Sequence, residues 1–231
     1  MFIIDWQVKD VINGAHSNAA QWLYSHWGEI SWYKTKGNAE VIGRFTAHVV
    51  DLVQAHKNGS GLGDVLDCAD VFGEGITEYA DILADQDAFD VSKNVDQAVG
   101  KCLENTNVLI IHNIELLPQA RHHNIGIDAL RHLITRLGSG VGLIVAWPRP
   151  AQFEFVDPYP EITDFNWLDL LRLDEFQGSK ERGVAKFRQR LEGLGFVPLP
   201  GNDLMVAPGP AVKARKAIHT TEQVTIDVHA Y

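Results

Sequence analysis

The sequence has few cysteines and no long apolar run. Its two cysteines, Cys68 and Cys102, are not in a Cys-x-x-Cys spacing, which excludes a disulfide framework and a cysteine metal site. The longest apolar runs, Val108–Ile111 and Val141–Trp147, are far shorter than the roughly 18 residues of a membrane helix. The N-terminus has no basic segment followed by an apolar stretch, so no signal peptide is expected. We therefore predict a reduced, cytoplasmic protein that does not enter a membrane.

Positive charge is also scarce. There are 20 Lys and Arg residues against 30 Asp and Glu residues, which gives a formal net charge of −10. A general nucleic-acid binder neutralises phosphates and is therefore basic, so we expect neither nucleic acid nor an anionic membrane as a partner. Arg149 and Arg172 are expected to be surface charges. The apolar fraction of 45% is that of a folded globular chain.

A length of 231 residues suits one enlarged domain or one domain with an appendage. Four of the six tryptophans lie within the first 32 residues. We expect residues 1–38 to form a Trp-rich N-terminal appendage, residues 39–207 to form the main domain, and residues 208–231 to be a C-terminal tail. Aromatic side chains in such a stretch pack a core, line the acceptor side of a cleft or form a homodimer interface, and the sequence does not choose among these.

Helical and extended patterns alternate along the main domain, which predicts an α/β fold. Strands are expected at Glu40–Val53, Asn107–Leu117, Val141–Trp147, Phe196–Leu199 and Leu204–Val206. Amphipathic helices are expected at Val65–Leu83, Ile125–Leu137 and Arg182–Leu194, and the first is either continuous or interrupted at Gly73-Glu74-Gly75.

The connection between the second of these strands and the following helix carries the clearest chemical signal. Pro118 ends the strand, a short polar loop follows, and the helix begins near Ile125. The first N–H groups of a helix have no intrahelical partner and lie at the positive end of its dipole, which makes this loop an anion site. Arg121 adds a positive charge, and Gly126 lets a ligand approach. Neither a Walker loop nor a complete dinucleotide fingerprint is present.

At these residues the sequence resembles the GNAT superfamily of acyl-coenzyme-A-dependent N-acetyltransferases. The segment from Pro118 to Gly126 (PQARHHNIG) is similar to the family's Arg/Gln-x-x-Gly-x-Gly/Ala motif at the mouth of a helix. Downstream, residues 185–196 (AKFRQRLEGLGF) and the strand around Met205 look like the family's late helix and final strand. The resemblance covers Asn107–Val206.

The resemblance implies a mixed, mostly antiparallel central sheet, flanked by helices, whose splayed strands form the coenzyme A cleft. It implies acetyl-CoA as cosubstrate and a small-molecule or peptide amine as acceptor. The residues expected to bind the cosubstrate are Leu116, Leu117, Arg121, His122, His123, Asn124, Ile125, Gly126 and Ile127. No metal site is expected, because adjacent histidines rarely ligate one ion and no third ligand is suitably spaced.

The sequence departs from the family pattern at three positions. Asn124 replaces the first motif glycine, and Asn tolerates a left-handed backbone better than most residues. Leu191 stands where many members have the Tyr that protonates the leaving thiolate. His112 stands where many have a Glu general base, and a histidine of pKa near 6.5 is a sound base at neutral pH.

Two residues remain candidates for the catalytic base. A histidine in an apolar strand is more often a core residue than a base, and Glu115 in the same strand needs either a partner or a wet cleft. Strand alternation places His112 and Glu115 on opposite faces unless a bulge intervenes.

The sequence thus predicts an N-acetyltransferase that uses acetyl-CoA. An inactive GNAT-like module that binds acyl-CoA or a partner protein is the alternative, motivated by Asn124 and Leu191. An unrelated binder of nucleotide phosphates, using the same helix N-terminus, is a third interpretation.

Overall fold

The computed structural model describes residues 2–10, 19–35, 38–69, 75–85, 91–100, 107–121, 124–150, 165–175 and 178–209. Cys102, His122, His123 and nearly all of the expected C-terminal tail lie outside these residues. None of the helices in the described ranges has the length and apolarity that crossing a bilayer requires.

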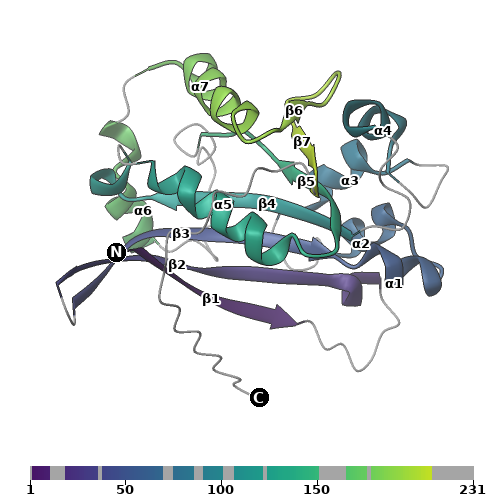
Figure 1. Ribbon diagram of the computed structural model, residues 1–231, viewed down its shortest axis with the longest axis horizontal. Helices are drawn as coiled ribbons and strands as arrows, with labels where there is room; N and C mark the ends of the chain where they lie inside the picture. Colours follow the sequence, from purple (N-terminus) through teal and green to yellow (C-terminus); the bar gives the residue numbers. More distant parts are fainter. Residues whose placement is uncertain are drawn as a thin grey trace.

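The described chain forms one seven-stranded sheet with the order β1-β2-β3-β4-β5-β7-β6 (Figure 1). Its strands are β1 (Phe2–Asp10), β2 (Leu23–Thr35), β3 (Asn38–Val50), β4 (Asn107–Leu116), β5 (Val141–Ala146), β6 (Val197–Pro198) and β7 (Met205–Pro208). β4 and β5 are parallel, and the other neighbouring pairs are antiparallel. The expected fold class, a mixed and mostly antiparallel sheet flanked by helices, is confirmed.

The N-terminal region belongs to this sheet. Residues 1–38 were expected to be an appendage, but β1 pairs with β2 along its whole length and β2 pairs with β3. Trp22 and Trp32 pack against the core, whereas Trp27 is 42% exposed.

Strand alternation sends side chains of β4 and β5 into two separate cores. Val108, Ile110 and Val145 pack into a core under the short helices on one face. These helices are α1 (Leu52–Lys57), α2 (Leu62–Ala69), α3 (Thr77–Leu83) and α4 (Lys93–Val99). Leu109 and Ile144 pack on the other face, under α5 (Ile125–Leu137) and α7 (Lys180–Glu192).

A smaller apolar cluster lies near the end of β4. It joins Leu117 to Trp167 and Leu171 of α6 (Phe165–Leu171). Three 3₁₀ turns, η1 (Ala19–Trp22), η3 (Pro118–Ala120) and η5 (Leu173–Glu175), complete the described elements.

Two helical predictions had different outcomes. The predicted helix Ile125–Leu137 is observed with the same bounds, because buried residues recur every three or four positions and Gly138 ends it. For Val65–Leu83 the continuous helix is wrong, and the alternative of a helix interrupted around Gly75 is confirmed. The structure has two helices there, and Gly75, just before the second, has a φ of +61°, which interrupts helical geometry.

Candidate active site

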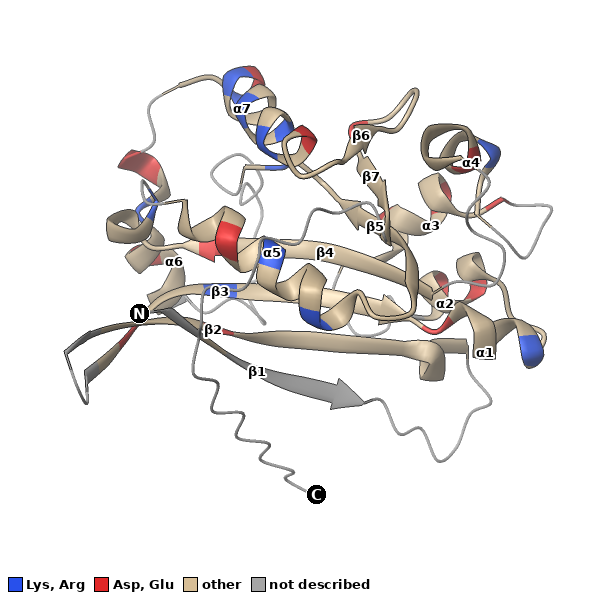
Figure 2. Cartoon of the chain, viewed as in Figure 1, with Lys and Arg blue, Asp and Glu red and all other residues tan. Residues whose placement is uncertain are grey.

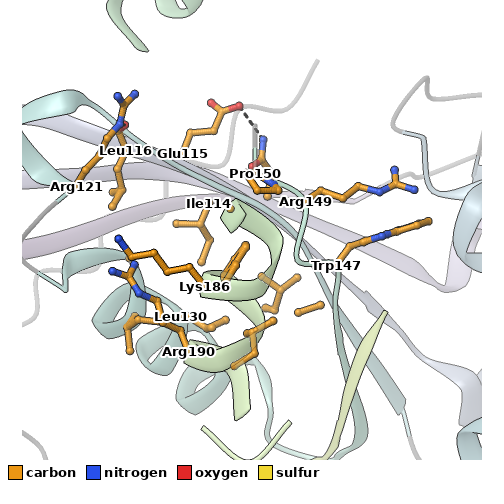
Figure 3. A pocket seen from close by; sticks show the side chains of 18 of the residues that line it. Ile114, Glu115, Leu116, Arg121, Leu130, Trp147, Arg149, Pro150, Lys186 and Arg190 are labelled. Atoms are coloured by element: carbon orange, nitrogen blue, oxygen red, sulfur yellow. Dashed lines mark hydrogen bonds between the residues drawn. The ribbon is translucent and has the colours of Figure 1, made fainter. Parts of the chain in front are cut away.

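The cleft forms where β4 and β5 part. The two strands pair only as far as Ile111 and Ala146. Beyond this point β4 continues along β3 to Leu116, whereas β5 ends and the chain turns away through Trp147. A cavity of about 570 Å³ opens between them, lined also by the start of α5 and by α7 (Figure 3). This is the splayed-strand cleft that the sequence resemblance implies.

A bulge in β4 decides which side chains face the cleft together. Ala47 of β3 is opposite Ile111, and the next residue, Thr46, is opposite Asn113, so His112 is an extra residue in β4. An extra residue reverses the alternation beyond it. Ile114 accordingly packs on the α5 face, and His112 shares the opposite face with Glu115.

His112 lies deep in the cleft wall. Its ring contacts the rings of His48 and Tyr79, with centroids 5.6 Å and 6.0 Å apart. Its buried Nδ1 has no hydrogen-bond partner among the described residues. Burial lowers the pKa of His112, the positive charge of Arg149 lowers it further, and Glu78 opposes these effects. His112 is therefore neutral at pH 7 and able to accept a proton.

Arg149 is part of the cleft and not a surface charge, contrary to the expectation from sequence. Its guanidinium carbon lies 3.0 Å from the centroid of the Trp147 ring, and its Nη2 lies 2.7 Å from Oε2 of Glu78. The Trp147 ring in turn packs edge-on against Tyr79, 5.5 Å away. The chain segment after β5 is thereby fastened to α3. Arg172, in contrast, is exposed and pairs with Glu175, as expected.

Glu115 is held in place by two donors. Nδ2 of Asn113 donates to its Oε1 at 2.7 Å, and Nε1 of Trp167 donates to its Oε2 at 2.5 Å. Both contacts fix the carboxylate at the rim where β4 meets α6. Such a fixed carboxylate suits binding better than proton transfer, since each oxygen already accepts a hydrogen bond.

The loop before α5 has the backbone geometry that the sequence predicts. Asn124 is left-handed, with φ 57°, and its carbonyl accepts hydrogen bonds from the N–H groups of Ile127 and Asp128 at 3.0 Å each. The preceding N–H groups of the helix have no intrahelical acceptor. Gly126 lies against Leu116, because a Cβ there would come within 3.2 Å of Leu116 Cδ1.

Arg121 lines the cleft but also has a structural part. Its Nε donates to the carbonyl of Leu116 at 2.8 Å, and its Nη2 donates to the carbonyl of Leu171. Partial burial lowers its pKa. Arg121 therefore ties the end of β4 to α6, in addition to any charge that it offers to a ligand.

The seven predicted binding residues that the structure describes divide into two groups. Five of them line the cleft: Leu116, Arg121, Asn124, Gly126 and Ile127. The side chains of Leu117 and Ile125 are buried in apolar clusters instead. His122 and His123 lie outside the described residues.

The cations of α7 were not identified from the sequence. Arg182, Lys186 and Arg190 all line the cleft, and Figure 2 shows the basic character of this helix. Their spacing of four residues places them on one helix face, and this spacing was the available signal. Leu191, singled out from the sequence as a departure from the pattern that it resembles, is fully buried beside them.

Comparisons with known proteins give matches to solved structures alone. No family model and no curated protein matches the chain. A point mutant of the AtaT toxin, bound to the C-terminus of the antitoxin AtaR and acetyl-CoA, is similar with a TM-score of 0.37 and 8% identity, over 90% of this chain and 95% of that one. The KacTA–DNA complex is similar with a TM-score of 0.39 and 8% identity, over 91% and 95%. Similarities this low do not assign an activity or a ligand.

Proposed function

We propose that this protein is an N-acetyltransferase that moves an acetyl group from acetyl-CoA to an amine. The observation that carries the proposal is the cleft between β4 and β5, which has the neutral, partly buried His112 in one wall and a helix N-terminus with a row of cations in the other.

The residues around the cleft suit a long, anionic cosubstrate. Negative phosphates would be bound by the N-terminus of α5 and by Arg182, Lys186 and Arg190. The apolar stretch between them, which includes Leu130 and Phe187, would take the uncharged arm. Gly126 lines the same end of the cleft and packs against Leu116, where a Cβ would come within 3.2 Å of Leu116 Cδ1.

His112 would act as the base. When bound, acetyl-CoA supplies an acyl group as a thioester, whose carbon–sulfur bond breaks as the nitrogen–carbon bond forms. The proton that the amine loses passes to His112 and leaves with the thiol. The bulge leaves backbone groups of β4 outside the ladder, where an N–H can stabilise negative charge on the acyl oxygen. The walls of the cleft would hold the two reactants next to each other, which favours their reaction.

Two measurements test this proposal. Titration calorimetry with acetyl-CoA measures binding, and release of free thiol in the presence of an amine panel measures transfer. The triple variant R182A/K186A/R190A should lose cosubstrate affinity by tenfold or more, because charge-assisted contacts to phosphate are lost. Lys180→Ala is the matched control, since Lys180 is an exposed cation of the same helix that does not line the cleft. The absence of any heat of binding in the wild type would overturn the proposal.

A binding module without catalysis is the second candidate. It is favoured by Leu191, which places no hydroxyl where many GNAT members have their acid, and by the two hydrogen bonds that occupy Glu115. Binding of acetyl-CoA with no thiol release for any amine would select this candidate over the enzyme.

A further inference from the structure

Charge is unevenly distributed around the cleft. Five of the described lining residues are cations, and Glu115 is the single acid among them. The cations Arg182, Lys186 and Arg190 lie on α7, and in Figure 3 Lys186 and Arg190 extend side by side. Glu115 lies on β4, beyond His112. The one negative group is thus placed apart from the α7 row that suits an anionic cosubstrate.

Glu115 keeps acceptor capacity toward the cleft. A carboxylate has about four lone-pair positions, and the hydrogen bonds from Asn113 and Trp167 use two of them. Arg44 is directly opposite Glu115 on β3, but its Nε lies 3.6 Å from Glu29 and its guanidinium covers the Trp167 ring at 4.2 Å. The carboxylate is therefore a rigid anion with room for a further donor.

The bulge sets the spacing between this anion and the base. His112 and Glu115 are on the same face, and because the bulge makes two residues of β4 span one residue of β3, their Cα atoms are separated by roughly 8 Å, at about 3.3 Å for each regular strand residue. The two side chains are also anchored toward opposite ends of β4, because the ring of His112 packs against Tyr79 of α3 whereas Glu115 accepts a hydrogen bond from Trp167 of α6 (Figure 1). If His112 receives the proton, Glu115 binds a different group.

We propose that Glu115 binds a second, non-reacting cationic group of the acceptor, so that the preferred acceptor is a diamine or a larger compound with two separated amino groups. This inference rests on the proposed function for the identity of the reacting amine. A lysine side chain of a peptide also satisfies this requirement when the peptide carries a second positive charge that reaches Glu115 while the lysine amine lies at His112.

The surroundings of His112 support this division of labour. Burial and the charge of Arg149 disfavour a second positive charge there, so an amine that reaches His112 is favoured in its neutral, nucleophilic form. Near Glu115 the opposite holds, since a carboxylate stabilises an ammonium. A diamine can therefore be bound at Glu115 through one ammonium group while its other amino group loses a proton and reacts near His112.

The test compares α,ω-diamines with n-alkylamines of the same chain length, from four to eight carbons. Binding to the full chain is measured by titration calorimetry without cosubstrate, and transfer is measured by thiol release with acetyl-CoA. We expect a diamine of intermediate length to bind at least tenfold more tightly than its matched monoamine, the ratio of one charge-assisted contact. In Glu115→Gln this ratio should fall to about one, through KM more than kcat.

Two variants refine the test. Glu115→Asp withdraws the carboxylate by one methylene, so the optimum should move to a longer diamine. Asp128→Asn is the control for loss of a negative charge, because Asp128 is exposed on α5 and pairs with Arg131 outside the cleft; its selectivity should equal the wild type's.

Equal binding of diamines and monoamines by the wild type would overturn the inference, and this comparison does not depend on any variant folding. An equal loss of affinity for diamines and monoamines in Glu115→Gln would also overturn the inference, because a catalytic base or a structural residue affects both classes of amine equally. A clear diamine preference in binding without thiol release would instead support this site and refute the proposed transferase activity.

Discussion

Gly43 of β3 packs closely against the end of β4, and its substitution tests the packing beside the cleft. A Cβ on Gly43 would lie 2.6 Å from the carbonyl oxygen of Glu115 and 2.7 Å from Cδ2 of Leu116. The first of these atoms belongs to the backbone of a paired strand, so it cannot rotate away. Gly43→Ala therefore requires β3 and β4 to separate by several tenths of an ångström.

The expected cost follows from this geometry. Overpacking a buried site by one methyl group destabilises a protein by about 1–3 kcal/mol. For a chain of this size, each kcal/mol lowers Tm by about 2–4 °C, so a fall of about 2–12 °C is expected in Gly43→Ala. The displaced strand carries Glu115, so the diamine preference should weaken as well. Calorimetric melting and urea unfolding measure the first effect.

Gly63 is the matched control. It lies in α2, and a Cβ there would meet Ala84 Cβ at 3.4 Å, an ordinary contact. Because Gly in a helix is less favourable than Ala by about 0.5–1 kcal/mol, Gly63→Ala should raise Tm. A Gly43→Ala variant that melts with the wild type would show that β3 and β4 are not in close contact here.

Three further predictions concern charge. Burial lowers the pKa of His48 to about 3, so the unfolded chain takes up a proton that the folded chain refuses between about pH 6.5 and pH 3, and stability should fall on acidification by about 1.4 kcal/mol per pH unit. In His48→Gln the free energy of unfolding should therefore fall less steeply as the pH is lowered. Arg149→Met removes a charge that lowers the pKa of His112, so the acid limb of the kcat/KM profile should move to higher pH. Acetyl-CoA affinity, measured calorimetrically, should weaken as salt rises; a constant or increasing affinity would contradict a cationic binding site.

The elements with a strong pattern were predictable from the sequence. α5 has a continuous three- and four-residue apolar repeat with Gly at its end, and β5 is a short apolar run before Pro148, so both were placed within one residue. β2 was missed because Ser25 and Ser31, both buried, interrupt its apolar face. A strand that buries polar residues is stabilised by pairing with its neighbouring strands, and this pairing cannot be recognised from the sequence of the strand alone.

The site was predictable only where one segment builds it. The strand, loop and helix from Asn107 to Leu137 are local, and five of the predicted binding residues line the cleft. The bulge at His112 was left open, because its position is set by register with β3 and no Gly or Pro marks it. The ion pair of Arg149 with Glu78 joins residues distant in sequence, so composition assigned Arg149 to the surface.

The acidic balance of the whole chain does not conflict with a site for an anion, because the two act over different distances. At about 20 Å, a distance comparable with the size of the chain, ten negative unit charges in water repel one negative charge of a ligand by about 2 kcal/mol. Screening over a Debye length of about 8 Å reduces this repulsion to a few tenths of a kcal/mol. A single cation 4 Å from a phosphate, at the effective dielectric constant of a protein surface, contributes about 4 kcal/mol. The cations of α7 therefore dominate once an anion enters the cleft. By the same reasoning, Glu115 dominates for a cation at the rim, so the net charge of −10 predicts neither ligand and the local placement of charges predicts both.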